Sequence, residues 1–221
     1  MKKIAKERSL GEQAYDIIKQ SIISGDLSPG DVLPEEKVAG DLGISRTPLR
    51  EALQLLAQDG LIVMEKGKRA AVASYSPSEA LDYLEVRSVL EAYNIQTIEY
   101  TLDEALISDL EKNIGLQERT IKDLDYQEFN DLDWAFHLLL AERNKNKTLA
   151  EMIKQVNKGV NRAFLLLSKT LPISVKDAVE EHKSIVNALK DRDISLAKLK
   201  MEYHIQQVGK RIQTYLKEGE F

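Results

Sequence analysis

The feature of this sequence that most constrains its fold is a connection of only three residues, Gly43-Ile44-Ser45, between two helical patterns. The helix before it carries Pro34 in its first turn, and the helix after it covers about 46–59, with apolar side chains every three or four residues. Glycine suits the left-handed conformation that ends a helix, and Ser45 is a good N-cap for the next one. Two short helices joined so closely predict a helix-turn-helix.

The segments on either side extend this motif to a winged helix. An amphipathic helix is expected at about 10–24, and it is followed by the turn Ser28-Pro29-Gly30. After the motif, the apolar runs 61–64 and 70–73 enclose a polar loop, which indicates a β-hairpin. We therefore expect a winged-helix domain of three helices plus a hairpin over residues 1–74.

Basic residues gather at three places in this domain, although the whole chain has a net charge of −5. They are Lys2, Lys3, Lys6 and Arg8, then Arg46 and Arg50, then Lys66, Lys68 and Arg69. Local basic clusters in an acidic chain are compatible with a nucleic-acid contact surface or with ordinary solvated charge.

The predicted fold gives two of these clusters a role in DNA binding. Arg46, Thr47 and Arg50, together with the preceding Ser45, lie where a recognition helix enters the major groove. Arginine there can bind guanine with two hydrogen bonds, and threonine can contact a phosphate or a thymine methyl group. The wing residues Lys66, Lys68 and Arg69 suit phosphates or the minor groove. Alternatively, Arg50 pairs with Glu51 or Gln54, and Arg46 is merely solvated.

The remainder of the chain predicts a second domain of helices alone. After a linker at 75–78, which includes a capping-box spacing between Ser76 and Glu79, residues 79–221 contain little glycine and only one further proline, Pro172. The expected helices are 77–101, 103–122, 126–143, 147–169, 174–190 and 193–217. The fold class is therefore mainly α, with a six-helix bundle after the winged helix.

All three histidines lie on apolar helix faces of this bundle. Asp133 and His137 are spaced i, i+4 and so share a face, while His182 and His204 lie on two other helices. Three neutral imidazoles and a carboxylate suit Zn, Ni, Fe or Mn. Nothing in the pattern itself shows that the four side chains converge, and each histidine could instead be a hydrogen-bonded core residue.

The first domain resembles GntR-type regulators in three runs. They are Ile22–Glu35 (IISGDLSPGDVLPE), Gly43–Leu53 (GISRTPLREAL) and Asp59–Ile62 (DGLI). The resemblance implies a dimeric winged-helix regulator that binds a palindromic DNA operator through Arg46, Thr47 and Arg50. The wing departs from the family pattern, because Lys68 is followed by Arg69 where the family usually has glycine.

The second domain resembles the ligand-binding domain of the FadR-like subfamily, here called FCD-type. The similar segments are Asp133–His137 (DWAFH), Glu181–Leu189 (EHKSIVNAL) and Asp193–His204. The resemblance implies that Asp133, His137, His182 and His204 bind one divalent cation. Relatives without these residues bind acyl-CoA, so the metal-bearing branch is favoured.

A metal with open coordination positions could also bind a small carboxylate effector. Arg87 is the first candidate for the acid's partner, and its alternative is a surface ion pair with Glu91 at i, i+4. Asn161 and Arg162 are weaker candidates.

These observations predict a cytoplasmic, homodimeric transcription regulator without a membrane span, controlled by a small organic acid. The chain has no cysteine and no nucleophile or phosphate-loop motif, which disfavours thiol chemistry and an enzyme. The alternatives are a purely structural metal, an acyl-CoA-type ligand and, remotely, a metal-dependent enzyme. The sequence leaves open whether the regulator represses or activates.

Overall fold

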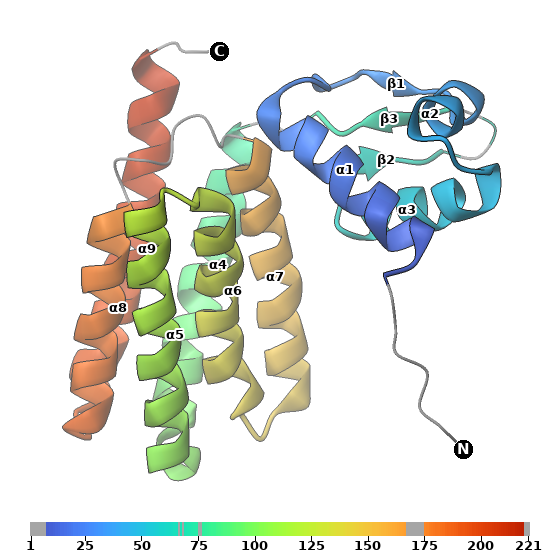
Figure 1. Cartoon of the computed structure of the whole chain (residues 1–221). Helices are drawn as coiled ribbons and strands as arrows, with labels where there is room; N and C mark the ends of the chain where they lie inside the picture. Colours follow the sequence, from blue (N-terminus) through green and yellow to red (C-terminus); the bar gives the residue numbers. More distant parts are fainter. Residues whose placement is uncertain (1–7, 66, 68, 75–76, 167–174, 219–221) are drawn as a thin grey trace, which may run out of the picture. The chain divides into compact units, whose positions relative to one another are not determined.

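The computed structural model of the chain describes residues 8–65, 67, 69–74, 77–166 and 175–218, with the backbone alone at 77, 126–127, 161–166 and 215–218. It divides into two compact units, Met1–Tyr75 and Ser76–Phe221 (Figure 1).

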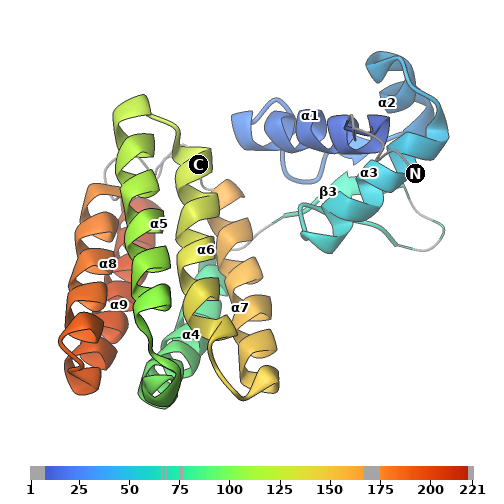
Figure 2. The ribbon, with the colours of Figure 1, turned by 60° about the horizontal axis from the view of Figure 1, so that its bottom comes forward.

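The first unit is the winged helix. Its helices are α1 (Leu10–Ser24), α2 (Glu35–Leu42) and α3 (Arg46–Gln58), which lie close together (Figure 2). Its strands are β1 (Val32–Leu33), β2 (Ile62–Val63) and β3 (Ala70–Val72). They form an antiparallel sheet in the order β1-β3-β2, so the predicted hairpin β2–β3 is confirmed and gains a third strand. The two residues of β1 are too few to show an alternating pattern.

Local signals fix the ends of α1. The Ser9 hydroxyl accepts a hydrogen bond from the Glu12 amide while the Glu12 carboxylate accepts one from the Ser9 amide, which is a capping box. At the other end Gly25 adopts φ = 84°, the left-handed conformation that glycine tolerates without strain. The predicted bounds 10–24 are therefore confirmed.

The helix-turn-helix is built as predicted, with two small differences. Gly43 ends α2 at φ = 65°, and α3 begins at Arg46. Ser45 occupies the N-cap position, but its side chain makes no capping hydrogen bond. Pro34 is the N-cap of α2 rather than a residue of its first turn. The buried stripe of α3, Leu49, Ala52, Leu53 and Leu56, is fully covered and packs on α1.

The second unit is a bundle of six α-helices within the described residues. They are α4 (Pro77–Thr97), α5 (Glu104–Asp123), α6 (Tyr126–Glu142), α7 (Lys147–Leu166), α8 (Val175–Lys190) and α9 (Ile194–Glu218). The predicted first helix, 77–101, ends early at Thr97 and is followed by the short 3-10 helix η1 (Glu99–Thr101). The predicted residues 167–169 and 174, and the Ser76 side of the predicted capping box, lie outside the described residues.

Aspartates and two left-handed residues set the breaks between these helices. Asp103, Asp125 and Asp193 each accept a hydrogen bond from a backbone amide three residues on, at the starts of α5, α6 and α9. Leu124 and Arg192 have φ values of 57° and 58°, although they are not glycine. These turns fall where the sequence predicts the breaks.

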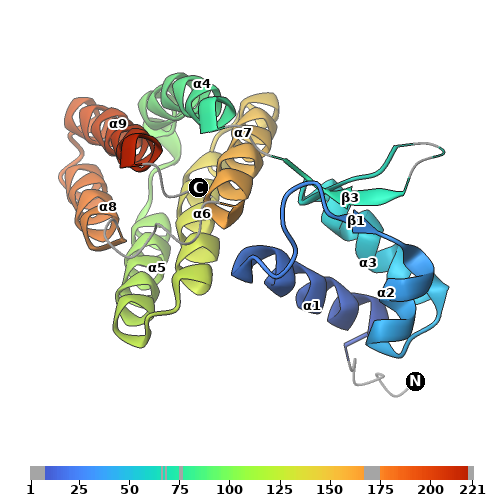
Figure 3. The same ribbon diagram turned by 90° about the horizontal axis from the view of Figure 1, so that it is seen from above.

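The helices pack in a ring in which each contacts the next, in the order α4, α7, α6, α5, α8, α9 and back to α4. Figure 3 shows this ring nearly end-on. Every helix therefore presents one face to a shared interior. None of the helices, within the described part of the chain, combines the length and apolar character that crossing a bilayer requires.

Candidate functional site

The four predicted metal ligands meet in the interior of the bundle. Asp133 and His137 come from α6, His182 from α8 and His204 from α9, and one potential ligand atom of each lies within 4.8 Å of the others. The three imidazoles are buried, with exposed fractions of 1%, 0% and 0%. The structure thus brings together four residues that the sequence places on three separate helices.

Each imidazole is held by its Nδ1 atom. His137 Nδ1 bonds to a carboxylate oxygen of Glu91, His182 Nδ1 lies 2.9 Å from Gln117 Oε1, and His204 Nδ1 lies 2.7 Å from Glu181 Oε2. An ionised carboxylate can only accept, so the Nδ1 atoms beside Glu91 and Glu181 carry the hydrogen.

The three Nε2 atoms face the cluster without a hydrogen-bond partner among the described residues. In a neutral imidazole with hydrogen on Nδ1, Nε2 carries a lone pair, which is the form that ligates a metal. Buried polar atoms are rarely left without a partner. Three such atoms beside the Asp133 carboxylate fit a divalent cation, and the nitrogen and oxygen donors suit Zn, Ni, Fe or Mn.

Arg87 of α4 is part of this interior and is only 1% exposed. Its Nε donates to Glu91 Oε1 at 2.7 Å, and Asn157 of α7 donates to the same oxygen at 3.0 Å. Its Nη2 lies 3.9 Å from Asp133 Oδ2 and makes no hydrogen bond to the described residues. The alternative of a surface ion pair with Glu91 is therefore wrong in its location: the pair exists, but it is buried.

Burial and neighbouring charges set the ionisation of the cluster. Burial lowers the pKa of His182 and of His204 well below the ordinary value, and the other cationic groups nearby lower it further. Burial alone would raise the pKa of Glu91, but His137 and Arg87 outweigh it and hold that pKa far below its usual range. Burial raises the pKa of Glu181, against the opposing effect of Arg211. His182 and His204 are consequently neutral near pH 7, as metal ligation requires.

Sequence reasoning missed the residues that hold the imidazoles. Gln117 on α5 holds His182 and Asn157 on α7 bonds to Glu91, and neither is a predicted site residue. Glu91 is predicted only as the alternative ion-pair partner of Arg87, and Glu181 only as part of the segment Glu181–Leu189. A signal existed: Gln117 and Asn113 interrupt the apolar stripe of α5, which includes Leu106 and Leu110. Polar residues on a buried stripe require partners.

Asn161 and Arg162 are the two remaining effector candidates. Both lie on α7, but their side chains are outside the described residues.

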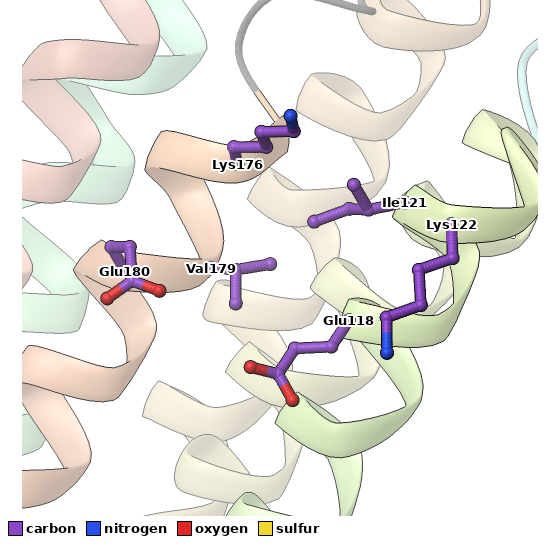
Figure 4. Close-up of a pocket in the computed structure, with 6 residues that line it drawn as sticks. All are labelled: Glu118, Ile121, Lys122, Lys176, Val179 and Glu180. Carbon is purple, nitrogen blue, oxygen red and sulfur yellow. The ribbon is translucent and has the colours of Figure 1, made fainter.

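An open depression of about 610 Å³ lies between α5 and α8 on the outside of the bundle (Figure 4). Its lining residues are Glu118, Ile121, Lys122, Lys176, Val179 and Glu180. Two lysines and two glutamates balance in charge, and no predicted site residue is among them. None of the four residues of the histidine cluster lines this depression.

In the winged helix, the predicted DNA-facing residues Ser45, Arg46, Thr47 and Arg50 are all exposed. Arg50 is paired with Glu35 at 2.9 Å, and Arg46 with Glu36 at 3.3 Å. The alternative in which Arg50 pairs with Glu51 or Gln54 is wrong, because its partner comes from the first turn of α2.

The wing is described only in part. Lys66 and Lys68 lie outside the described residues, whereas Arg69 is exposed and lines a depression of about 290 Å³ together with Arg46 and Met64. Gly67 has φ = 81°. The wing therefore has its left-handed glycine at position 67, before Lys68. The family pattern expects glycine at the position after Lys68, which Arg69 occupies.

Comparison with known proteins finds a matching family model within each of the two units. Residues 10–72 match the model of bacterial regulatory proteins of the gntR family, and residues 82–207 match the FCD domain. A HTH-type transcriptional regulator from an unstable DNA locus of Streptomyces ambofaciens is 31% identical over 88% of this chain and 81% of that protein. The gluconate operon transcriptional repressor of Bacillus licheniformis is 30% identical over 88% of this chain and 82% of that protein.

A solved structure has the same fold over nearly the whole length. E. coli McbR/YncC superimposes with a TM-score of 0.72 at 22% identity, covering 95% of this chain and all (100%) of that one.

Proposed function

This chain belongs to the GntR family of bacterial regulatory proteins and carries an FCD domain, and from this premise we propose that it is a homodimeric regulator controlled by a small organic acid bound at a metal centre. That it is a DNA-binding transcriptional regulator follows from the family and from relatives that are transcriptional regulators. The palindromic operator, the dimer, the metal and the effector are the proposed parts.

The observation that carries the metal proposal is the set of three Nε2 atoms beside Asp133 that have no hydrogen-bond partner among the described residues. Asp133, His137, His182 and His204 would hold the cation. When bound, the cation supplies positive charge and coordination positions that a ligand oxygen can take. The surrounding Glu91, Gln117 and Glu181 orient the imidazoles through Nδ1.

Charge supports an anionic effector at this centre. The described residues of the cluster contribute three carboxylates, from Glu91, Asp133 and Glu181, and two guanidinium groups, from Arg87 and Arg211. A divalent cation changes this excess of one negative charge into an excess of one positive charge, which favours an anion.

Arg87 is the proposed partner of the acid. Its buried Nη2 has no hydrogen bond to the described residues, and it lies near Asp133 on the side of the cluster. A carboxylate oxygen would give it a charge-assisted hydrogen bond. This observation favours a sensing site over a purely structural metal.

Metal content measured by mass spectrometry on tag-free protein tests the centre. We expect about one metal per chain by the ligand chemistry, and loss of the metal in His137→Ala and His182→Ala. If no metal binds even after loading with Zn, Ni or Mn, the centre is refuted, and acyl-CoA and other apolar ligands become the compounds to screen.

Operator binding measured with and without a panel of small carboxylates tests the effector. Arg87→Lys keeps a cation beside Glu91 but loses the planar guanidinium, so we expect it to weaken the response to the acid while the metal stays bound. An unchanged operator affinity across the panel, with the metal in place, favours the structural role instead.

For the DNA-binding unit, we propose that Arg46, Thr47 and Arg50, flanked by Ser45, contact bases and phosphates, and that Lys66, Lys68 and Arg69 contact the backbone or minor groove. The exposure of Arg46, Thr47 and Arg50 at the N-terminal end of α3 supports this role. A two-fold symmetric dimer would match a palindromic operator. Sedimentation measures how many protein chains are present in the free protein and in its DNA complex.

A further inference from the structure

His182 differs from the other two imidazoles in the kind of group that holds it. Glu91 and Glu181 present carboxylates to His137 and His204, but His182 Nδ1 faces the side-chain amide of Gln117 at 2.9 Å. An amide can accept through its oxygen or donate through its nitrogen. Gln117 by itself therefore does not decide which nitrogen of His182 carries the hydrogen.

A chain of hydrogen bonds that begins at a backbone carbonyl removes this ambiguity. The Leu132 carbonyl oxygen, which can only accept, receives a bond from Asn113 Nδ2 at 3.1 Å. Asn113 Oδ1 therefore faces the other way and accepts from Gln117 Nε2 at 2.7 Å. Gln117 is thus left with its oxygen toward His182, and the hydrogen must be on Nδ1.

Burial makes this orientation costly to reverse. Asn113 is 6% exposed and Gln117 and His182 are 0% exposed, so water cannot replace a broken link. Turning the Gln117 amide over would set its oxygen against Asn113 Oδ1. Turning both amides over would set Asn113 Oδ1 against the Leu132 carbonyl.

The orientation decides what His182 can do. Its Nε2 lies 3.4 Å from Asp133 Oδ1. With hydrogen on Nε2, the pair would be an ordinary His–Asp hydrogen bond, and the nitrogen could not ligate a metal. With hydrogen on Nδ1, a lone pair faces a carboxylate across the cluster, and a cation between them resolves the repulsion.

We propose that Asn113 and Gln117 are positioning residues that fix His182 in its metal-binding tautomer. The inference rests on the proposed metal centre. The proposal gives a role to α5, which supplies none of the four proposed ligands. Through Asn113 and Gln117, this helix connects the Leu132 carbonyl on α6 to the His182 side chain on α8. Asp133, the next residue after Leu132 on α6, is itself a proposed ligand, so the relay ties the two ligands together.

The direct test is the tautomer of His182 in metal-free protein, read by two-bond nitrogen–proton correlation in a sample labelled with 15N-histidine. In the unaltered protein we expect the hydrogen on Nδ1. Asn113→Leu frees the Gln117 amide to turn over, and Gln117→Leu removes the acceptor, so both variants are expected to gain the Nε2–H form, which can bond to Asp133.

Asn144→Leu is the matched control. Asn144 is also a buried asparagine, 3% exposed, and it bonds to Asn94 and Thr97 rather than to the cluster. We expect it to lower the melting temperature and leave the His182 tautomer unchanged. An Nε2–H tautomer in the unaltered protein, or an unchanged Nδ1–H tautomer in both relay variants, overturns the proposal. The tautomer of the unaltered protein tests the proposal even where a variant does not fold.

Metal affinity, measured for Zn²⁺ or Ni²⁺ by competition with a chromophoric chelator, gives the functional readout. Loss of an outer-shell partner typically weakens metal binding about 10–100-fold, which is the expected effect of Gln117→Leu. Unaltered affinity in both relay variants contradicts the proposal. If the unaltered protein binds no metal but shows the Nδ1–H tautomer and its loss in the variants, the metal centre is refuted while the relay stands.

Discussion

The winged helix and the bundle place their charged functional groups in opposite environments. Arg46 and Arg50 are exposed and pair with Glu36 and Glu35 in solvent, where an ion pair contributes little. In the bundle, Arg87, Glu91 and the histidines are buried; each imidazole is held through Nδ1, while the three Nε2 atoms and Arg87 Nη2 have no hydrogen-bond partner among the described residues. The exposed groups can exchange their partners for DNA at small cost, whereas the buried groups must be satisfied by the protein or by a bound ligand.

The difference also separates what each region can recognise. An exposed arginine can contact any surface that docks against it, so its binding specificity depends on the DNA that is docked. A buried cluster in which three Nε2 atoms lack a hydrogen-bond partner among the described residues suits a group that fits inside and supplies positive charge.

His182→Ala is expected to have the largest effect, because it removes a ligand from the buried centre. Loss of a residue that only orients a ligand weakens metal binding about 10–100-fold, and loss of the ligand itself should weaken it more. Isothermal titration calorimetry measures the metal affinity. Arg50→Ala in the winged helix serves as the control and should bind metal as before. Equal metal affinity in His182→Ala would falsify the ligand assignment.

The stability of metal-free protein should fall as the pH drops below about 6.5, the ordinary histidine pKa. The pKa of His182 and of His204 is lowered in the folded state, so the unfolded chain takes up protons first. Stability therefore rises with pH and is lost as pH falls, by at most about 1.4 kcal/mol per pH unit for each histidine. Urea unfolding at pH 7.5, 6.5 and 5.5 measures this.

The winged helix contains no histidine, so it supplies the comparison. Unfolding reported by signals from the bundle should shift with pH over this range more than unfolding reported from residues 8–74. A flat stability profile for the bundle would contradict the lowered pKa values.

Arg50→Ala should weaken operator binding by about 1–3 kcal/mol if Arg50 contacts a base. The loss of the pair with Glu35 contributes little, because both side chains are partly in solvent. A fluorescence anisotropy titration at two salt concentrations measures the change. Thermal stability that stays within a few degrees distinguishes lost recognition from lost folding.

Gly159→Ala tests how tightly the bundle is packed. A Cβ atom there would lie 2.5 Å from the ring of Tyr83, so α4 and α7 must separate or Tyr83 must move. We expect a loss of stability of about 1–3 kcal/mol. Gly40→Ala in α2 of the winged helix meets nothing within 4 Å and should instead stabilise by about 0.5–1 kcal/mol. Thermal melts of the two variants should therefore shift in opposite directions.

Glu36→Gln is expected to have the smallest effect. It removes the partner of Arg46, whose side chain is 55% exposed, and it removes a negative charge near the DNA-facing residues. Operator affinity should rise by less than about 1 kcal/mol, with the gain largest at low salt. A large loss of affinity would mean that Glu36 orients Arg46 for binding.

The sequence predicted the winged helix well because its signals are local. Gly43 ends α2 and Gly25 ends α1 through left-handed conformations that glycine adopts without strain. The strand β1 escaped prediction because its two residues pair with Ala70 and Ala71, far along the chain. In the bundle, the predicted helices and breaks largely agree with the structure, in which aspartates cap the starts of three helices.

The helix faces that carry the histidines follow from the sequence alone, since a period of 3.6 residues acts within a few turns. Three features depend on the folded bundle: these faces converge, Arg87 is buried, and Glu91 and Gln117 contact His137 and His182. Those contacts join residues 46 and 65 positions apart. No local preference encodes such distances; they arise when six helices close into a ring and each buried polar atom must find a partner.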